Sequence, residues 1–379
     1  MKLTSLAFIA ALGLSLHGLG SARADPFLDE MVAFDGASFF IEAKVPAFVI
    51  AVLRDGEISV QGFGERAGPG SPPPDGDTLM RIGSITKAFT GQVLAQLTAE
   101  GKVKLTTPLV ALAPEFAAAK DPRLKNVRLL DLVTHGGGFP REVPHEPGSD
   151  SDPFGPITPD AFAAWIKDNP LLFEPGTSVM YSNFAFDLLA IALSKSAKKP
   201  YPELLQELIT APLAMKDTVF EPSEEQRGRL MHTQAPNGED LPVVPTGPVI
   251  VGSGGLYSTP NDLMRWMKWH LDRLGSDGAE VRVLDHALYV PRDGLNTVSG
   301  VDTCGRMGAL GLAWIGMMPA DDQPFILQKS GGLQGEFSYV AFAPTRKAAV
   351  FVSINKFDFA AALQMCKFAN DLLATIAPR

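Results

Sequence analysis

Two short apolar runs stand near the start of the chain, and a turn separates them. The first covers residues 48–53 and the second residues 58–62, with Arg54-Asp55-Gly56-Glu57 between them. Asp-Gly between two apolar runs is a strong signal for a tight β-hairpin turn. The pattern therefore predicts a hairpin, and the Gly- and Pro-rich stretch 68–74 predicts a surface loop after it.

From Ser84 the hydrophobic pattern changes to the period of a helix. Apolar side chains recur every fourth residue, at Ile85, Phe89, Val93 and Leu97, and Gly101 closes the run. This spacing puts them on one helical face, and a glycine is a common residue just past a helix end. The pattern predicts a helix of about five turns.

The middle of the chain is predicted to be mostly helical. Residues 184–193 are apolar with few breakers, and Thr259-Pro260-Asn261-Asp262 is typical of a helix start. The helix after that start has a predicted buried stripe of Leu263, Trp266, Met267 and His270. Residues 145–160 are predicted to form a long acidic loop.

Strand patterns return at the end. Residues 325–328, 337–342 and 348–354 are rich in β-forming side chains, 344–347 predict a turn, and 359–376 predict a terminal amphipathic helix. Strands at both ends around a helical middle imply an α/β fold of the α+β type, with one antiparallel sheet built from both termini and flanked by helices. We expect residues 25–82 and 300–379 to form this sheet domain and residues 83–299 to form an inserted, mostly helical domain.

Residues 1–24 have the features of a secretory signal peptide. Lys2 precedes an apolar stretch over residues 3–19, and Ala22-Arg23-Ala24 supplies a small-x-small cleavage pattern. The alternative is a membrane anchor, which we favour less because the apolar stretch is short for a span of about 20 residues. No later segment has the length and apolarity of a span, so we expect an exported protein.

The composition limits the classes of partner. The 379 residues include 33 basic and 42 acidic side chains, a net charge of −9, and 46% of them are hydrophobic. This is the profile of a globular protein, and the negative charge argues against nucleic acid as a partner. The two cysteines, Cys304 and Cys366, allow one bridge or two unpaired thiols.

We expect no cofactor. Two cysteines are too few for a thiolate zinc site. Four of the histidines have no histidine four residues away and no cysteine neighbour: His145, His232, His270 and His286. A zinc site assembled from residues distant in sequence is the one metal site left open.

Ser84-Ile85-Thr86-Lys87 is the first candidate for chemistry. Positions i and i+3 share a helix face, so the hydroxyl and the amine can meet. Lysine can take the proton of a serine nucleophile if burial or nearby positive charge lowers its pKa. The positive end of the helix dipole would also favour an anion developing at Ser84.

The same spacing occurs twice more and is less informative there. Ser353 and Lys356 lie in a predicted strand, where they would point to opposite faces. Ser196 and Lys199 lie in a lysine-rich helix end that we expect to face solvent. Only the pair at Ser84 is flanked by apolar residues at a helix start.

Two further motifs could complete a site. In Tyr181-Ser182-Asn183, a phenol near lysines could move a proton, and an amide could bind a substrate amide. Its alternative reading is a loop tyrosine before a helix capped by Asn183. In Lys329-Ser330-Gly331-Gly332, a cation and a hydroxyl suit a carboxylate, and the alternative is a plain strand exit with a surface lysine.

The order Ser-x-x-Lys, Tyr-x-Asn, Lys-Ser-Gly resembles the serine penicillin-recognising enzymes, namely class C β-lactamases and low-molecular-mass penicillin-binding proteins. Within this family the chain is most similar to the AmpH type of D-alanyl-D-alanine carboxypeptidase/endopeptidase. The similarity covers nearly all of the chain after the signal peptide and includes Arg81-Ile82-Gly83-Ser84, Leu132-Val133-Thr134-His135, Tyr181 to Leu189, Met215-Lys216-Asp217-Thr218, Gly252 to Pro260, Met264-Arg265-Trp266-Met267, and Gln328-Lys329.

The resemblance implies a site between a sheet domain and a helical domain, in the periplasm. Ser84 would attack, Lys87 with Tyr181 would move protons, and Asn183 would orient the substrate amide. Lys329 and Ser330 would hold its carboxylate, and the backbone N–H groups of Ser84 and Gly332 would form the oxyanion hole beside Gly331. Two departures are Ser330 in place of the commoner Thr, and a Thr134-His135-Gly136-Gly137-Gly138 stretch, which leaves the substrate range open.

The expected activity is serine acyl transfer on D-alanyl-D-alanine peptides, β-lactams or both. No Glu-x-x-Leu-Asn stretch is present for deacylation, so Tyr181 would have to serve there. A family VIII-type carboxylesterase and a non-catalytic binding protein on the same scaffold are the alternatives. His135 as a catalytic base is a weaker alternative, because Ser84 already has Lys87 and no Gly-x-Ser-x-Gly elbow exists. The oligomeric state is left open.

Overall fold

The computed structural model describes residues 25–149, 151–247 and 249–378. The predicted signal peptide, residues 1–24, lies outside these ranges. Within them, no helix has both the length and the apolarity needed to cross a bilayer.

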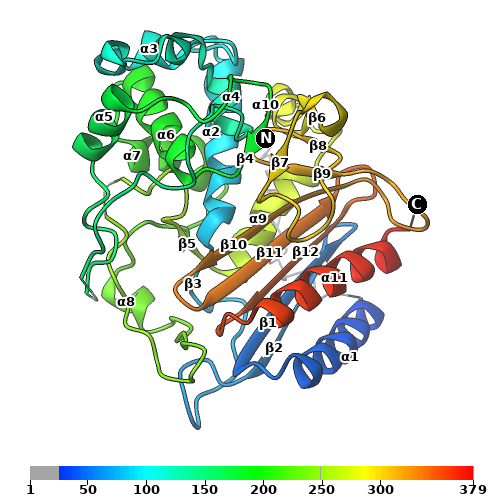
Figure 1. Ribbon diagram of the computed structural model, residues 1–379. Helices are drawn as coiled ribbons and strands as arrows, with labels where there is room; N and C mark the ends of the chain where they lie inside the picture. The colour runs from blue at the N-terminus through cyan, green and yellow to red at the C-terminus, as the bar shows by residue number, and fades with distance from the viewer. Residues whose placement is uncertain (1–24, 150, 248, 379) are drawn as a thin grey trace, which may run out of the picture.

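The core of the fold is an eight-stranded antiparallel sheet in the order β2-β1-β12-β11-β10-β9-β8-β6 (Figure 1). Its strands are β1 (Ala47–Arg54), β2 (Glu57–Gly64), β6 (Val290–Pro291), β8 (Ala309–Leu310), β9 (Ile315–Met317), β10 (Ile326–Leu333), β11 (Glu336–Ala343) and β12 (Ala348–Ile354). The N-terminal hairpin joins the C-terminal strands because β1 pairs with β12. The predicted fold class is confirmed. β6 belongs to the sheet, although we assigned its residues to the helical domain. The boundary between the two domains stays a prediction.

The predicted hairpin forms at the predicted turn. Arg54 pairs with Glu57, and the two residues between them, Asp55 and Gly56, have φ of 50° and 93°. Two positive φ values suit the two-residue turns whose twist matches the strands, and Asp-Gly adopts them readily.

Helices cover both faces of the sheet. α1 (Pro26–Ala43) and α11 (Phe359–Ile376) lie side by side on one face, and α9 (Pro260–Leu271) packs on the other (Figure 1). Alternate β1 side chains enter the two cores, with Phe48, Ile50 and Val52 on the α1 side and Val49, Ala51 and Leu53 on the α9 side. An apolar run with both faces buried therefore replaces the usual alternation of apolar and polar residues.

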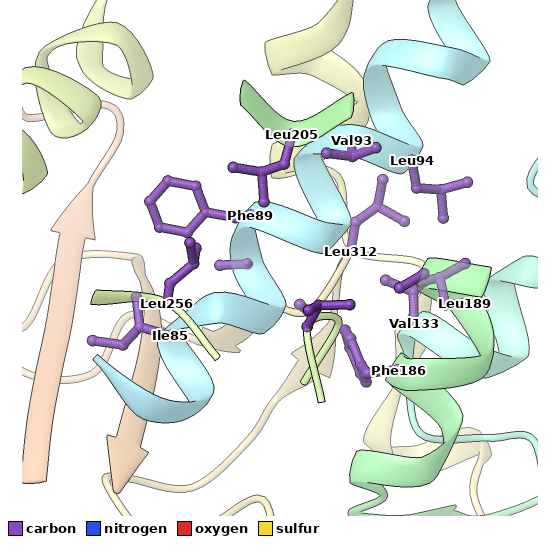
Figure 2. Packing of buried hydrophobic residues seen from close by; sticks show 14 of the residues in the cluster. Ile85, Phe89, Val93, Leu94, Val133, Phe186, Leu189, Leu205, Leu256 and Leu312 are labelled. Atoms are coloured by element: carbon purple, nitrogen blue, oxygen red, sulfur yellow. The ribbon is translucent and has the colours of Figure 1, made fainter. Parts of the chain in front are cut away.

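A central helix begins later than the sequence pattern predicts. Gly83–Ile85 form a 3₁₀ turn (η1), and the α-helix α2 covers Thr86–Ala99, so the predicted five turns are too many. The residues of its predicted stripe are all buried. Most of the remaining α2 side chains are buried as well, because helices and loops surround the helix (Figure 2).

The remaining elements connect these layers. The two small sheets pair β3 (Met80–Arg81) with β5 (Tyr257–Ser258), and β4 (Val179–Met180) in parallel with β7 (Val298–Ser299). The other helices are α3 (Leu109–Leu112), η2 (Pro114–Ala118), η3 (Pro122–Asn126), α4 (Leu129–Val133), α5 (Pro159–Asp168), α6 (Asn183–Ala197), α7 (Tyr201–Leu205), η4 (Gln206–Thr210), α8 (Glu224–Arg227), α10 (Ala279–His286) and η5 (Arg292–Gly294).

Two sequence predictions in this region are confirmed. Thr259 caps α9 by accepting a hydrogen bond from the Asp262 amide at 3.2 Å, and the predicted stripe of that helix is buried. The two cysteines, for which both states were open, form a disulfide that joins Cys304, in the segment before β8, to Cys366 in α11.

Truncating a buried sheet residue should show how much the sheet core stabilises the fold. Phe351 in β12 is fully buried, so Phe351→Ala should lower the free energy of unfolding by about 3–5 kcal/mol. Phe34 in α1 is 73% exposed, so Phe34→Ala should change it by less than about 0.5 kcal/mol. Denaturant unfolding of both variants checks this, and equal losses would contradict the burial assignment.

Candidate active site

Ser84 and Lys87 meet at the start of α2. The Lys87 Nζ donates to the Ser84 Oγ at 3.1 Å. Ser84 lies in the 3₁₀ turn and Lys87 in the first turn of the α-helix, so the i, i+3 spacing still puts both on one face. Lys87 is fully buried and Ser84 is half-buried.

Two more acceptors hold the Lys87 amine. It donates to the Asn183 Oδ1 at 2.5 Å and to the Ser253 carbonyl at 2.7 Å. Burial lowers the pKa of Lys87 to about 7, with the negative charges of Asp187 and Glu142 opposing the shift. A large fraction of this lysine is therefore neutral at pH 7, the form that can accept a proton.

Two glycines let strand β10 pack against the Ser84 turn. A Cβ at Gly331 would lie 2.0 Å from the Ile82 carbonyl oxygen. A Cβ at Gly83, where φ is 48°, would lie 2.8 Å from the Gly332 nitrogen. The backbone of the Lys-Ser-Gly-Gly motif is thus brought directly against the nucleophile's turn.

The Tyr181 ring lies among three cations. The Lys87 Nζ is 4.9 Å, the Lys329 Nζ 5.3 Å and the Arg141 guanidinium carbon 4.9 Å from its centroid. The Tyr181 amide donates to the Ser299 carbonyl at 3.0 Å, which fixes the residue beside β7.

Asn183 begins α6, but it does not cap it. The cap is Ser182, whose Oγ accepts from the Ala185 amide at 3.0 Å, so the alternative reading of Asn183 as the cap is wrong. The Asn183 side chain is free to act elsewhere. Its Oδ1 accepts from Lys87 and its Nδ2 donates to Glu142.

Lys329 is buried inside a strand, and not on the surface at a strand exit. β10 continues through the whole motif to Leu333, and Lys329 is 1% exposed. Burial lowers the pKa of Lys329 to about 8, with Tyr181 opposing the shift and Lys87 adding to it. Its Nζ donates to the Ser330 carbonyl at 2.9 Å.

Ser330 follows on the opposite face of the strand, because successive side chains alternate. Pairing of β9 with β10 stops at Gln328, so within the described residues no strand pairs with residues 329–333 on the side away from β11. A ligand along this open edge could contact both the Lys329 and the Ser330 side of the strand.

His135 is stacked on Tyr181 with its centroid 4.5 Å away, and its Nδ1 accepts from the Ser182 amide at 3.0 Å. Burial lowers the pKa of His135 well below its usual range, and the charges of Lys87 and Lys329 add to this. Among the described residues, no hydrogen bond joins His135 to Ser84. The geometry gives it a packing role beside the tyrosine.

Several polar residues of the site were missed in the sequence. Arg141, whose carbonyl accepts from the Asn183 amide at 2.8 Å, lies in a loop, as does Glu142. Asp187 is buried and accepts from the Ser253 Oγ at 3.0 Å, and burial raises its pKa well above its usual range. The one available signal was Asp187, a charged residue within the apolar run 184–193.

The other two Ser-x-x-Lys pairs do not form sites. The Ser353 Oγ lies 2.8 Å from the Ser338 Oγ inside the sheet. Lys199 pairs with Glu207 at the surface. The largest cavity described, about 1110 Å³, lies between α6, α7 and residues 245–247, 249 and 251, and none of the predicted site residues lines it.

Comparisons with known proteins agree with this fold. The sequence profile of the Beta-lactamase family matches residues 24–374. The chain is 32% identical over 380 residues to the D-alanyl-D-alanine-carboxypeptidase/endopeptidase AmpH of Escherichia coli K12, covering 99% of this chain and 96% of that protein.

Two solved structures share the fold. One is a β-lactamase/D-alanine carboxypeptidase from Yersinia pestis complexed with citrate, with a TM-score of 0.83 and 34% identity over 93% of this chain and 99% of that one. The other is a β-lactamase/D-alanine carboxypeptidase from Pseudomonas syringae, with a TM-score of 0.75 and 20% identity over 90% of this chain and 98% of that one. The chain therefore belongs to the β-lactamase family and is similar to AmpH.

Proposed function

We propose that this protein is a serine acyl-transfer hydrolase that cleaves D-alanyl-D-alanine peptides, β-lactams or both through an acyl-enzyme on Ser84. The observation that carries the proposal is the buried Lys87 amine, 3.1 Å from the Ser84 Oγ and with its pKa lowered to about 7. A base whose pKa lies near the working pH is best suited to take the proton of a serine. The AmpH relative is named for this activity on peptides.

In the proposed mechanism, the Ser84 Oγ attacks the carbonyl carbon while its proton passes to Lys87. The oxyanion is stabilised by the N–H groups of Ser84 and Gly332. The intermediate then collapses, the C–N bond breaks, and Lys87 and Tyr181 return a proton to the leaving nitrogen. A water molecule later attacks the ester, loses a proton to the same groups and releases the acid and Ser84.

Recognition of the substrate uses two groups that flank the nucleophile. Asn183 orients the substrate amide, and Lys329 with Ser330 binds the carboxylate at the open edge of β10, along which Gly331 and Gly332 let the substrate approach. Both peptides that end in D-alanine and β-lactams present an amide beside a carboxylate, which favours these substrates over simple esters.

We further propose that the protein acts in the periplasm. The predicted signal peptide at residues 1–24 and the disulfide between Cys304 and Cys366 both support export, because disulfides persist in oxidising compartments.

Labelling with a penicillin tests the nucleophile. We expect intact-mass analysis to show a single covalent adduct on the wild-type protein and none on Ser84→Ala, since the alanine variant has no hydroxyl to acylate. Circular dichroism of Ser84→Ala verifies folding. A lasting adduct would indicate a penicillin-inhibited peptidase, and a brief adduct with loss of the antibiotic would indicate a β-lactamase. An adduct on the folded alanine variant would overturn the mechanism.

The pH dependence of acylation tests the base. Neutral Lys87 is the active form, so the rate should be low at acid pH and rise with a midpoint near pH 7. The Glu142 charge raises the Lys87 pKa, so Glu142→Gln should shift the midpoint to lower pH. Glu146→Gln, an exposed change in the same loop, is the matched control and should leave it in place. An unshifted or upward-shifted Glu142→Gln profile would contradict Lys87 as the base.

Replacing Lys329 distinguishes this function from an esterase. Lys329→Met keeps the length of the side chain but removes a charge-assisted hydrogen bond worth about 1.5–3 kcal/mol, so kcat/KM on D-alanyl-D-alanine peptides should fall roughly 10- to 100-fold. Turnover of a short nitrophenyl ester should hardly change. Lys347→Met, at the exposed turn between β11 and β12, should alter neither rate. High ester turnover without peptide or penicillin turnover would favour the carboxylesterase.

A further inference from the structure

A second cluster of titratable side chains lies between helices α9 and α10, and shares no residue with the proposed active site. The His270 Nδ1 and the His286 Nε2 share a hydrogen bond of 2.8 Å. The Asp285 Oδ2 lies 3.6 Å from the first nitrogen and 4.0 Å from the second. One atom from each of the two imidazoles and the carboxyl group therefore lies within 4.8 Å of the other two.

The cluster is buried, and part of its hydrogen-bonding capacity is unused among the described residues. The side chains of His270 and Asp285 are fully buried and that of His286 is 15% exposed. The Asp285 Oδ2 accepts from the Trp314 Nε1 at 2.8 Å, but the Asp285 Oδ1 has no hydrogen-bond partner among the described residues. Leaving a buried carboxylate oxygen without a partner costs free energy that a ligand could recover.

Burial favours the neutral form of all three side chains in the cluster. Burial lowers the pKa of His270 well below its usual range and that of His286 to about 4, and Arg282 adds to both shifts. Burial raises the pKa of Asp285 to about 8, and the hydrogen bond from Trp314 opposes this shift.

We propose that His270, Asp285 and His286 bind one divalent transition-metal ion, with zinc as the ion that fits best. Ligands of a tetrahedral zinc with bonds of about 2.1 Å lie about 3.4 Å apart, and the three observed separations of 2.8, 3.6 and 4.0 Å bracket this value. Two imidazoles and one carboxylate oxygen are ligands that zinc uses. Calcium and magnesium are disfavoured because they require a shell of oxygen ligands.

Small movements complete the coordination. His286 is the last residue of α10 and the least buried of the three, so its ring can move away from His270 toward the ideal spacing. The unpartnered Asp285 Oδ1 is available as a further ligand. The Trp314 N–H on the Asp285 Oδ2 acts as the outer hydrogen bond that orients a metal-binding carboxylate.

The metal would be structural. The His270 ring is enclosed by the rings of Trp266, Trp269, Trp314 and Phe342 at 4.7 to 5.4 Å, which leaves no room for a substrate. Trp266 in turn stacks on Phe89 of α2 at 4.0 Å and donates to Gln92 at 2.7 Å. The ion would therefore join α9 and α10 and hold them against the helix that carries Lys87.

Metal analysis of the full chain tests the site. After removal of metal with a chelator, the wild-type protein should bind one zinc per chain in competition with a chromophoric chelator, and zinc should raise its melting temperature. His286→Gln should weaken binding by at least about 100-fold, since it removes a ligand. His145→Gln changes an exposed histidine in the loop before α5 and should bind zinc as the wild type does.

A spectroscopic readout locates the ion and needs no variant. Three of the four tryptophans contact or enclose His270, so cobalt(II) at this site should quench most of the tryptophan fluorescence, and zinc should reverse the quenching. If His286→Gln fails to fold, this fluorescence measurement tests the metal site by itself. Absence of stoichiometric zinc in the wild type, or wild-type affinity in a folded His286→Gln, would overturn the proposal. Both results are independent of penicillin labelling at Ser84.

Discussion

The desolvated amine of Lys87 is the constraint on which the rest of the site depends. A fully buried lysine is tolerated here because three acceptors from three parts of the chain, at residues 84, 183 and 253, satisfy its hydrogen bonds. Those acceptors fix how η1, α6 and the segment before β5 must come together. The same burial that makes the amine costly lowers its proton affinity, so packing and reactivity have a single cause.

Much of this arrangement could be predicted from sequence because it is local. The Asp-Gly hairpin, the every-fourth-residue pattern of α2, and the shared face of Ser84 and Lys87 all depend on neighbouring residues. The rest depends on tertiary contacts. β10 extends past Lys329 because β11 pairs with Gly331 and Gly332, residues that weaken any strand pattern read from one segment. Glu142 and Ser253 lie in loops, whose contacts the sequence does not encode locally.

Aromatic rings connect the two polar centres of the protein. Phe89 on α2 stacks on Trp266, whose ring meets the edge of His270. The buried Lys87 amine of α2 lies on one side of this stack. The imidazoles and the carboxyl group near the ends of α9 and α10 lie on the other side. The core between the two centres is densely packed and rigid. It therefore absorbs small shifts poorly and transmits them. The helix that carries Lys87 is therefore positioned from its middle as well as from its start.

The pairing of β1 with β12 has a consequence for how the protein is made. Phe48 faces Ile354 across the ladder, and these residues are about 300 positions apart in the chain. During synthesis the first hairpin has one edge without a partner until almost the last residues have emerged, so the sheet closes only at the end. A chain that cannot complete its core early remains incompletely folded for longer, which leaves its apolar strands dependent on protection from aggregation until then.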